Sequence, residues 1–226
     1  STNIKVKNVI VDNNPFYYSA GNVVEKKGNT VTIEVLDEHP RRDKMKAFIM
    51  GVYDYNKQGN KKTRITWNSN LPEWNTVVGG NGRRMQINYE PLASVVNIGD
   101  GVFWFQGDYT NSCQMIMNYK VTGLNYENVK ILNATGFALT SDFCKDITYT
   151  KVKVAPEGNR IAVAPRDALK MSNARGTVLI DEVVVNGTGD DAQQCPGMWT
   201  SVYKKMSNNT LVLDAWPLNA SAHEAI

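Results

Sequence analysis

The stretch that decides the fold is Val121-Thr-Gly-Leu124-Asn-Tyr126-Glu-Asn-Val129-Lys-Ile131, because its apolar pattern recurs elsewhere in the chain. A shift of 23 residues gives Cys144-Lys-Asp-Ile147-Thr-Tyr149-Thr-Lys-Val152-Lys-Val154, with the same apolar positions. Two further copies have the same spacing: Val178, Ile180, Val183 and Val185 toward the C-terminus, and Ile4, Val6, Val9 and Val11 near the N-terminus. An internal repeat of this kind is typical of solenoid architectures.

Each copy has two apolar residues at spacing two, then a step of three, then two more at spacing two. Spacing two is typical of a strand with one buried face, and the step of three indicates a bend. We therefore predict an all-β, right-handed parallel β-helix, in which each coil needs its neighbours to bury its apolar face. Two of the expected columns are Leu124 on Ile147 on Val178, and Val129 on Val152 on Val183. The alternative, a β-sandwich with unequal strands, would not match positions across the bend.

The first copy lies 120 residues before the second, which is far too long for one coil. We therefore predict an inserted, barrel-like antiparallel β subdomain over residues 15–105. Residues 22–35 are predicted to form a hairpin with a turn at Lys27-Gly28-Asn29. Residues 79–82 are predicted to form another turn, and Val102-Phe-Trp-Phe105 a buried strand. No amphipathic helix of useful length is expected.

The predicted organisation has four parts. Residues 1–14 form a β-helix coil, residues 15–105 the insertion, and residues 106–197 the coils that carry the candidate site. Residues 198–226 are the start of a second β insertion or a tail, since residues 201–213 repeat the hairpin pattern.

Charge and hydropathy exclude several classes of partner. The chain has 25 Lys and Arg against 22 Asp and Glu, a formal charge of +3, and no run of more than two basic residues. It therefore lacks the basic footprint of a nucleic-acid-binding protein. No apolar stretch approaches the roughly 18 residues of a membrane span, so no membrane insertion is expected. Four Asn-x-Ser/Thr sequons indicate a secreted, periplasmic or cell-surface protein.

The candidate chemistry lies in a recurring Asp-Ala pair. Asp167-Ala168 returns 24 residues later as Asp191-Ala192, the length of about one coil, so both aspartates should occupy equivalent positions on adjacent coils. Ala168 and Ala192 should then face inward, and both aspartates outward. Asp190 would join them because Gly187 and Gly189 allow a bend. Closely spaced carboxylates raise one pKa, which supplies the acid and the base of glycoside hydrolysis. A single aspartate here would more often be a solvated charge or a turn cap.

These motifs resemble glycoside hydrolase family 110, the α-1,3-galactosidases, of the pectate-lyase-like β-helix group. Asp167-Ala and Gly189-Asp190-Asp191-Ala carry the resemblance, and residues 8–24 are similar to the coil that precedes a β-barrel insertion in that family. The resemblance implies a fragment of a longer enzyme that removes terminal α-linked galactose from glycans with inversion, without a metal or cofactor. It also implies that the three aspartates are the acid and base. Three further residues are candidate substrate contacts: Arg166, Lys170 and Gln193.

One departure leaves other functions open. Relatives usually continue Asp-Asp-Ala with Asn and then His, whereas this chain has Gln193-Gln194-Cys195. The departure favours a non-catalytic glycan-binding or scaffold β-helix, while the survival of all three aspartates favours hydrolysis. The arrangement also resembles the polygalacturonases of family 28, although their downstream His-Gly and Arg-x-Lys signals are absent.

Overall fold

The computed structural model describes residues 1–54, 60–66, 72–77, 81–106, 114–158, 160–197, 201–208 and 210–214. These residues are almost entirely β structure, and the helix α1 (Glu90–Ala93) has only four residues. The chain divides into two compact units, Ser1–Cys195 and Pro196–Ile226. Within the described residues, none of the helices is long and apolar enough to cross a membrane.

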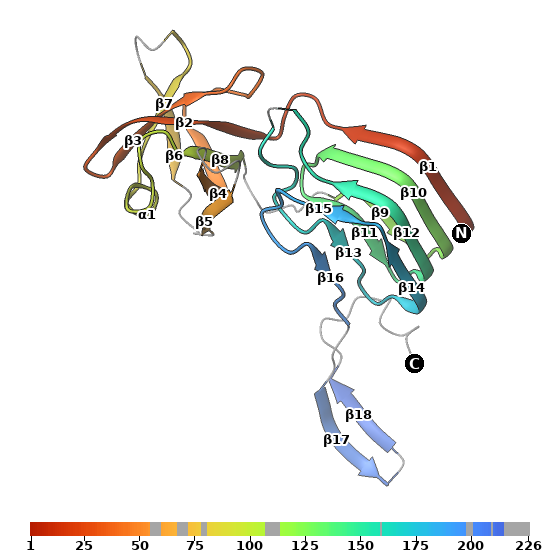
Figure 1. Cartoon of the computed structure of the whole chain (residues 1–226). Helices are drawn as coiled ribbons and strands as arrows, with labels where there is room; N and C mark the ends of the chain where they lie inside the picture. Colours follow the sequence, from red (N-terminus) through yellow and green to blue (C-terminus); the bar gives the residue numbers. More distant parts are fainter. Residues whose placement is uncertain are drawn as a thin grey trace. The chain divides into compact units, whose positions relative to one another are not determined.

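A parallel sheet contains all four copies of the repeat. Its strands are β1 (Thr2–Asp12), β10 (Thr122–Asn133), β12 (Lys145–Val154), β14 (Arg175–Asp181) and β15 (Val184–Val185) (Figure 1). The register places Leu124 beside Ile147 and Ile147 beside Val178, as the repeat predicts. Val129 likewise lies beside Val152. The predicted alignment of these strands is confirmed, and their parallel pairing excludes the antiparallel β-sandwich.

The step of three in the repeat has a conformational cause. At the third position of that step each copy of the repeat has a residue in the left-handed region: Asn8 at φ 58°, Asn128 at 52°, Lys151 at 54° and Glu182 at 50°. Such a residue reverses the alternation of side chains, so the apolar residues on both sides of it face inward. The Asn128 amide donates a hydrogen bond to Asn8 Oδ1 at 2.7 Å, which ties two of the bends together. Asparagine tolerates this conformation better than most residues.

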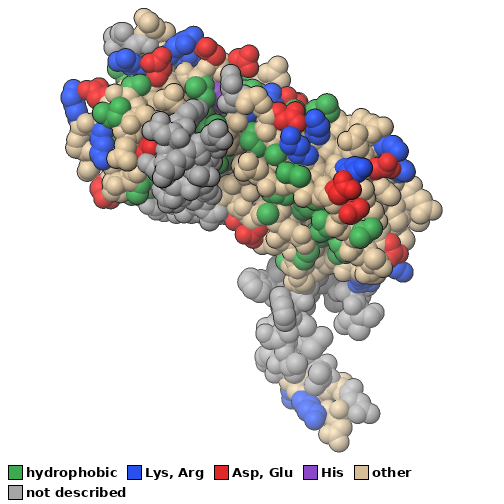
Figure 2. Space-filling view, viewed as in Figure 1, with side chains coloured by type: hydrophobic (Ala, Val, Ile, Leu, Met, Phe, Trp, Pro, Cys, Tyr) green, Lys and Arg blue, Asp and Glu red, His purple; other side chains and the backbone are tan. Residues whose placement is uncertain are grey.

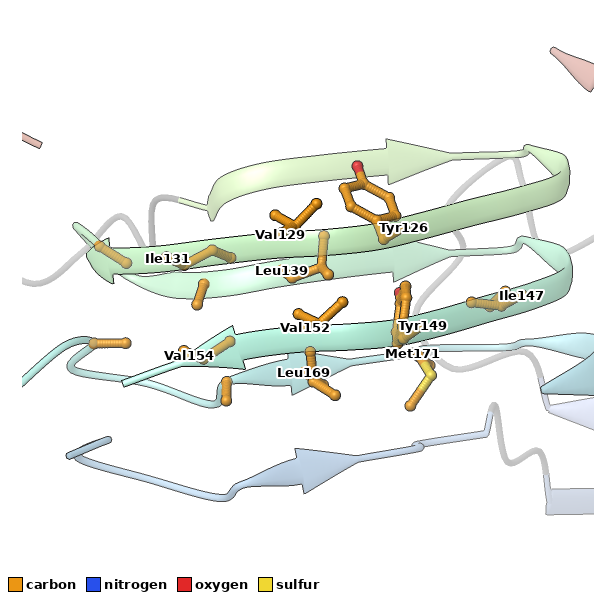
Figure 3. Packing of buried hydrophobic residues seen from close by; sticks show 14 of the residues in the cluster. Tyr126, Val129, Ile131, Leu139, Ile147, Tyr149, Val152, Val154, Leu169 and Met171 are labelled. Carbon is orange, nitrogen blue, oxygen red and sulfur yellow. The ribbon is translucent and has the colours of Figure 1, made fainter. Parts of the chain in front are cut away.

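A second parallel sheet faces the first across a shared core. Its strands are β9 (Gln114–Tyr119), β11 (Phe137–Asp142), β13 (Leu169–Lys170) and β16 (Gln193–Gln194). From β9 to β14 consecutive strands alternate between the two sheets; β15 follows β14 in the first sheet, and β16 returns to the second. Figure 3 shows Val129 above Val152 and Leu139 above Leu169, within one cluster of buried side chains from both sheets. We call this arrangement the two-sheet stack.

In the described part of the chain, each end strand of the stack has a neighbouring strand on one side only. Val129 and Val152 are fully buried, whereas Val9 in β1 and Val178 in β14 are 37% and 39% exposed. An end strand has a neighbour on one side only, and so its apolar residues keep part of their contact with water. Ala192 is exposed for the same reason: it aligns with the buried Ala168 in the register of β13 and β16, but it directly precedes β16, the end strand of its sheet among the described residues.

Between β1 and β9 the chain forms an antiparallel sheet that almost closes into a barrel. Its strands are β2 (Tyr18–Lys27), β3 (Thr30–Val35), β4 (Met45–Asp54), β5 (Asn60–Thr66), β6 (Glu73–Thr76), β7 (Arg84–Asn88) and β8 (Gly101–Gln106). They pair in the order β5-β4-β6-β7-β3-β2-β8, with an additional pairing of β4 and β8. The core includes Trp74 and Trp104, stacked with ring centroids 4.4 Å apart.

Two local predictions are confirmed in this sheet. Strands β2 and β3 form a hairpin in which Lys27 pairs with Thr30, and Gly28 in the turn has φ 54°. Residues Val102–Phe105 lie in β8 and are fully buried. The predicted turn at residues 79–82 falls partly outside the described residues, of which 81 and 82 form a turn.

The second unit contains the hairpin predicted near the C-terminus. Strands β17 (Ser201–Ser207) and β18 (Thr210–Asp214) pair antiparallel. The rest of the predicted tail, residues 198–200 and 215–226, lies outside the described residues. On the face of the molecule seen in Figure 2, acidic and basic side chains are interspersed, and no large basic patch gathers there.

Candidate active site

The recurring Asp-Ala pairs lie side by side in the second parallel sheet. Strands β13 and β16, which follow Asp167 and Asp191, pair with Leu169 beside Gln193 and Lys170 beside Gln194. The Ala168 N–H donates to the Asp191 carbonyl at 3.0 Å, so the pairing extends back to the two aspartates. The register confirms that the 24-residue interval brings these two backbone segments together.

Asp190 is placed by the turn that precedes it. Gly187 has φ 74°, in the region that favours glycine, and Gly189 N–H donates to the Ala164 carbonyl at 2.7 Å. The Thr188 hydroxyl donates to the Asp190 carbonyl at 3.0 Å and closes the turn. A regular strand would direct Asp190 and Asp191 to opposite faces, and this turn replaces the strand.

The three aspartates form a cluster that reaches from the interior to the surface. One carboxylate oxygen from each of Asp167, Asp190 and Asp191 lies within 4.8 Å of the other two. Asp167 is only 2% exposed, Asp190 is half-buried and Asp191 is exposed. Sequence reasoning expected Asp167 to point outward, but the neighbouring strands on both sides bury it. We call these three residues the aspartate cluster.

Burial also shapes the protonation of the cluster. Desolvation raises the pKa of Asp167, and the nearby charge of Asp190 raises it further, while the Lys170 ammonium opposes both effects. The Asp167 Oδ2 atom is buried and has no hydrogen-bond partner among the described residues. A charged oxygen without a partner is costly to bury, so these surroundings favour the protonated acid.

Two of the predicted substrate contacts stand beside the cluster and share an aromatic neighbour. Arg166 Nη1 lies 4.0 Å from Asp190 Oδ2. The Lys170 ammonium lies 4.3 Å from the ring centroid of Phe137, and the Arg166 guanidinium carbon lies 5.7 Å from it. Sequence reasoning missed Phe137, because an aromatic residue at the start of an apolar strand reads as ordinary core.

The third predicted contact, Gln193, is exposed in β16, directly after Asp191-Ala192. Its side-chain amide donates to the Cys195 sulfur at 3.4 Å. The residues that depart from the family pattern therefore contact each other at the edge of the site.

The aspartate cluster could also hold a hard cation. Three carboxylate oxygens within 4.8 Å of one another can share one divalent ion, since Ca²⁺ takes oxygen ligands at roughly 2.3–2.6 Å. Carboxylate clusters are equally suited to proton transfer. The burial of Asp167 favours the second use, because it stabilises the uncharged acid.

Gly189 should tolerate no side chain. A Cβ atom there would lie 2.5 Å from the Pro165 carbonyl oxygen, so the backbone must shift. We expect Gly189→Ala to lower the free energy of unfolding by roughly 1–3 kcal/mol and to displace Asp190, with a loss of site function. Urea unfolding measures the first effect. As a control, Gly197→Ala has open space around the new Cβ and should leave stability within about 0.5 kcal/mol.

Comparison with known proteins gives one partial relative and no family match. None of the protein-family models searched matches the chain. Over 89 residues the chain is 32% identical to alpha-1,3-galactosidase B of Phocaeicola vulgatus. The aligned region covers 38% of this chain and 15% of the relative, so the chain spans only a small part of that protein. This similarity is a hint of a glycoside hydrolase.

Proposed function

We propose that the aspartate cluster hydrolyses a glycosidic bond. The proposal rests on one observation: two carboxyl groups that lie close together differ in their exposure to water. Asp167 is buried with a raised pKa, while Asp191, whose carboxylate oxygen lies within 4.8 Å, is exposed to water. Glycoside hydrolysis needs one protonated acid and one ionised base at the same bond, and different surroundings are how proteins separate these roles.

In this proposal Asp167 is the general acid, and Asp190 and Asp191 act as the base. The Asp167 proton passes to the glycosidic oxygen as its bond to the anomeric carbon breaks. Water attacks that carbon and gives its proton to a carboxylate of Asp190 or Asp191. The sequence did not indicate which aspartate is the acid and which the base. The burial of Asp167 supports its role as the acid.

The proposed substrate is a neutral sugar, terminal α-linked galactose. The partial relative is named an alpha-1,3-galactosidase, and the motifs around the aspartates resemble those of glycoside hydrolase family 110. The absence of the downstream His-Gly and Arg-x-Lys signals favours a galactosidase over the polygalacturonase-like alternative.

We further propose that the two-sheet stack belongs to a right-handed parallel β-helix, with residues 15–105 inserted into it. The parallel register and the alternation of strands between the sheets support this proposal. The near-barrel formed by β2 to β8 lies within the proposed insertion.

Inversion of the anomeric carbon rests on the family resemblance. The clustered oxygens lie within 4.8 Å of one another, closer than the roughly 6.5–9.5 Å between the carboxyl groups of inverting enzymes. The observed spacing is nearer to the roughly 5–5.5 Å of retaining enzymes, so the resemblance alone supports inversion. Proton NMR of the first-formed sugar distinguishes the outcomes: β-galactose from an α-galactoside supports inversion, and α-galactose contradicts it.

Release of a chromophore from a 4-nitrophenyl α-galactoside tests the proposed activity. We expect turnover of this substrate and none of polygalacturonate. If the protein hydrolysed polygalacturonate alone, the result would contradict the galactosidase and support the polygalacturonase-like alternative. Binding to galactosyl glycans on an array without turnover of either substrate would contradict catalysis and support the non-catalytic alternative.

The dependence of kcat/KM on pH should be bell-shaped. Activity should rise as the base carboxylate loses its proton and fall as pH passes through the raised pKa of Asp167, because the acid is then ionised. The falling limb should therefore lie above the range of an ordinary aspartate. Both limbs belong to the cluster as a coupled system. A profile that stays flat toward alkaline pH would contradict the role of Asp167.

A further inference from the structure

Phe137 contacts both cations of the site. It opens strand β11, next to the backbone of Asp167, since the Ala138 N–H donates to the Asp167 carbonyl at 3.1 Å. The Lys170 ammonium and the Arg166 guanidinium lie 4.3 Å and 5.7 Å from its ring centroid. Both distances fall within the roughly 6 Å of a cation–π interaction.

The ring is not placed to bind a sugar. Aromatic residues that stack on sugars present an open face, whereas Phe137 is only 8% exposed and has cations over its ring. Its contacts are thus with the protein's own charged side chains.

Lys170 depends on this ring more than Arg166 does. Arg166 has Asp190 within 4.0 Å, but in the described part of the chain Lys170 makes no salt bridge within that distance and no side-chain hydrogen bond. A lysine side chain loses considerable rotamer freedom when its ammonium is held in one place. The contact with Phe137 offsets part of this loss, together with the attraction between the ammonium and the Asp167 carboxylate.

We infer that Phe137 is a positioning residue that holds Lys170 and Arg166 beside the aspartate cluster. Three carboxylates and two cations leave one negative charge, which one proton neutralises. That state, with one acid protonated and the others ionised, is the one that hydrolysis requires. The catalytic consequence rests on the proposed function, but the placement of the cations does not.

The test compares four variants. Phe137→Leu removes the ring and keeps most of the apolar volume, while Phe137→Tyr keeps the ring. Lys170→Met removes the cation and leaves the ring. Tyr119→Leu is the matched control, because Tyr119 holds Lys120 at 5.5 Å at the opposite end of the paired strands β9 and β11.

The first readout needs no substrate. The pKa of Asp167 is measured by carboxyl ¹³C NMR, with the signal assigned by its loss in Asp167→Asn. Because the Lys170 charge lowers the pKa of Asp167, both Phe137→Leu and Lys170→Met should raise it. Phe137→Tyr and Tyr119→Leu should leave it unchanged.

The second readout is hydrolysis. We expect Phe137→Leu to lower kcat roughly five- to tenfold with little change in KM, and Phe137→Tyr to keep kcat near that of the parent protein.

If Lys170→Met raises the pKa of Asp167 but Phe137→Leu does not, the ring is merely structural and the inference is wrong. The inference also fails if neither variant raises it. Should Phe137→Leu not fold, Phe137→Met takes its place: a raised pKa of Asp167 in Phe137→Met supports the inference, and an unchanged pKa overturns it. Absence of hydrolysis in the parent protein would contradict the proposed function and leave the NMR test intact.

Discussion

Asp167→Asn should abolish hydrolysis and, at the same time, raise the free energy of unfolding at neutral pH. The amide keeps the shape of the side chain but cannot donate an acidic proton. General acid–base catalysis contributes roughly 10²- to 10⁴-fold, so kcat should fall by about that factor. Initial rates with a 4-nitrophenyl α-galactoside measure the loss.

The gain in stability follows from the direction of the pKa shift. The pKa of Asp167 is higher in the folded protein than in the unfolded chain. The folded state therefore loses stability as pH rises from the unfolded pKa through the folded one, and the cost is complete above the folded pKa. An amide has no charge to desolvate. Urea unfolding at pH 7 should show a higher midpoint for Asp167→Asn, and the difference should disappear at pH 3.

Asp181→Asn provides the matched control, because Asp181 is exposed at the end of β14. It should change neither kcat nor the unfolding midpoint appreciably. A loss of stability in Asp167→Asn at neutral pH would mean that the carboxylate is a structural element. The catalytic assignment would then fail.

Val152→Asp should have the largest effect on stability. Val152 is fully buried in the shared core of the two-sheet stack, beside Val129 in the register of β10 and β12. An aspartate there would be an unpaired buried charge, and we expect a loss of roughly 4 kcal/mol or more in the free energy of unfolding. Chemical denaturation followed by far-UV circular dichroism measures it.

Thr148→Asp on the same strand separates burial from the effect of the charge itself. Thr148 is only partly buried, and its neighbours in register, Asn125 and Leu179, are uncharged. The Thr148→Asp variant should lose no more than about 1 kcal/mol in the free energy of unfolding. If Val152→Asp and Thr148→Asp lost the same free energy of unfolding, this would contradict the stacking of Val152 in a buried apolar column.

The sequence predicts the register of the first parallel sheet because stacking makes it nearly one-dimensional. Each copy must place its apolar residues on those of the next copy, so a fixed spacing along the chain becomes a column in space. Leu124, Ile147 and Val178 align for this reason. Local turn signals such as Gly28 are equally visible, since they depend on neighbours in the chain alone.

The aspartate cluster was predictable in part. The 24-residue interval places the backbones of Asp167 and Asp191 side by side, and the glycines before Asp190 indicate the turn. The burial of Asp167 was not predictable, because it depends on strands that cover the residue from both sides. The exposure of Ala192 depends in the same way on the absence of a neighbouring strand beyond β16 among the described residues.

The sequence by itself thus determined which strands pair in the first parallel sheet and which carboxylates meet. The tertiary structure alone decided how far each carboxylate is removed from water and which cations stand beside it. Phe137 lies 33 residues before Lys170, and no spacing rule joins the two. Their contact arises because a side chain on one strand reaches the strand stacked next to it, and such reach depends on packing in three dimensions.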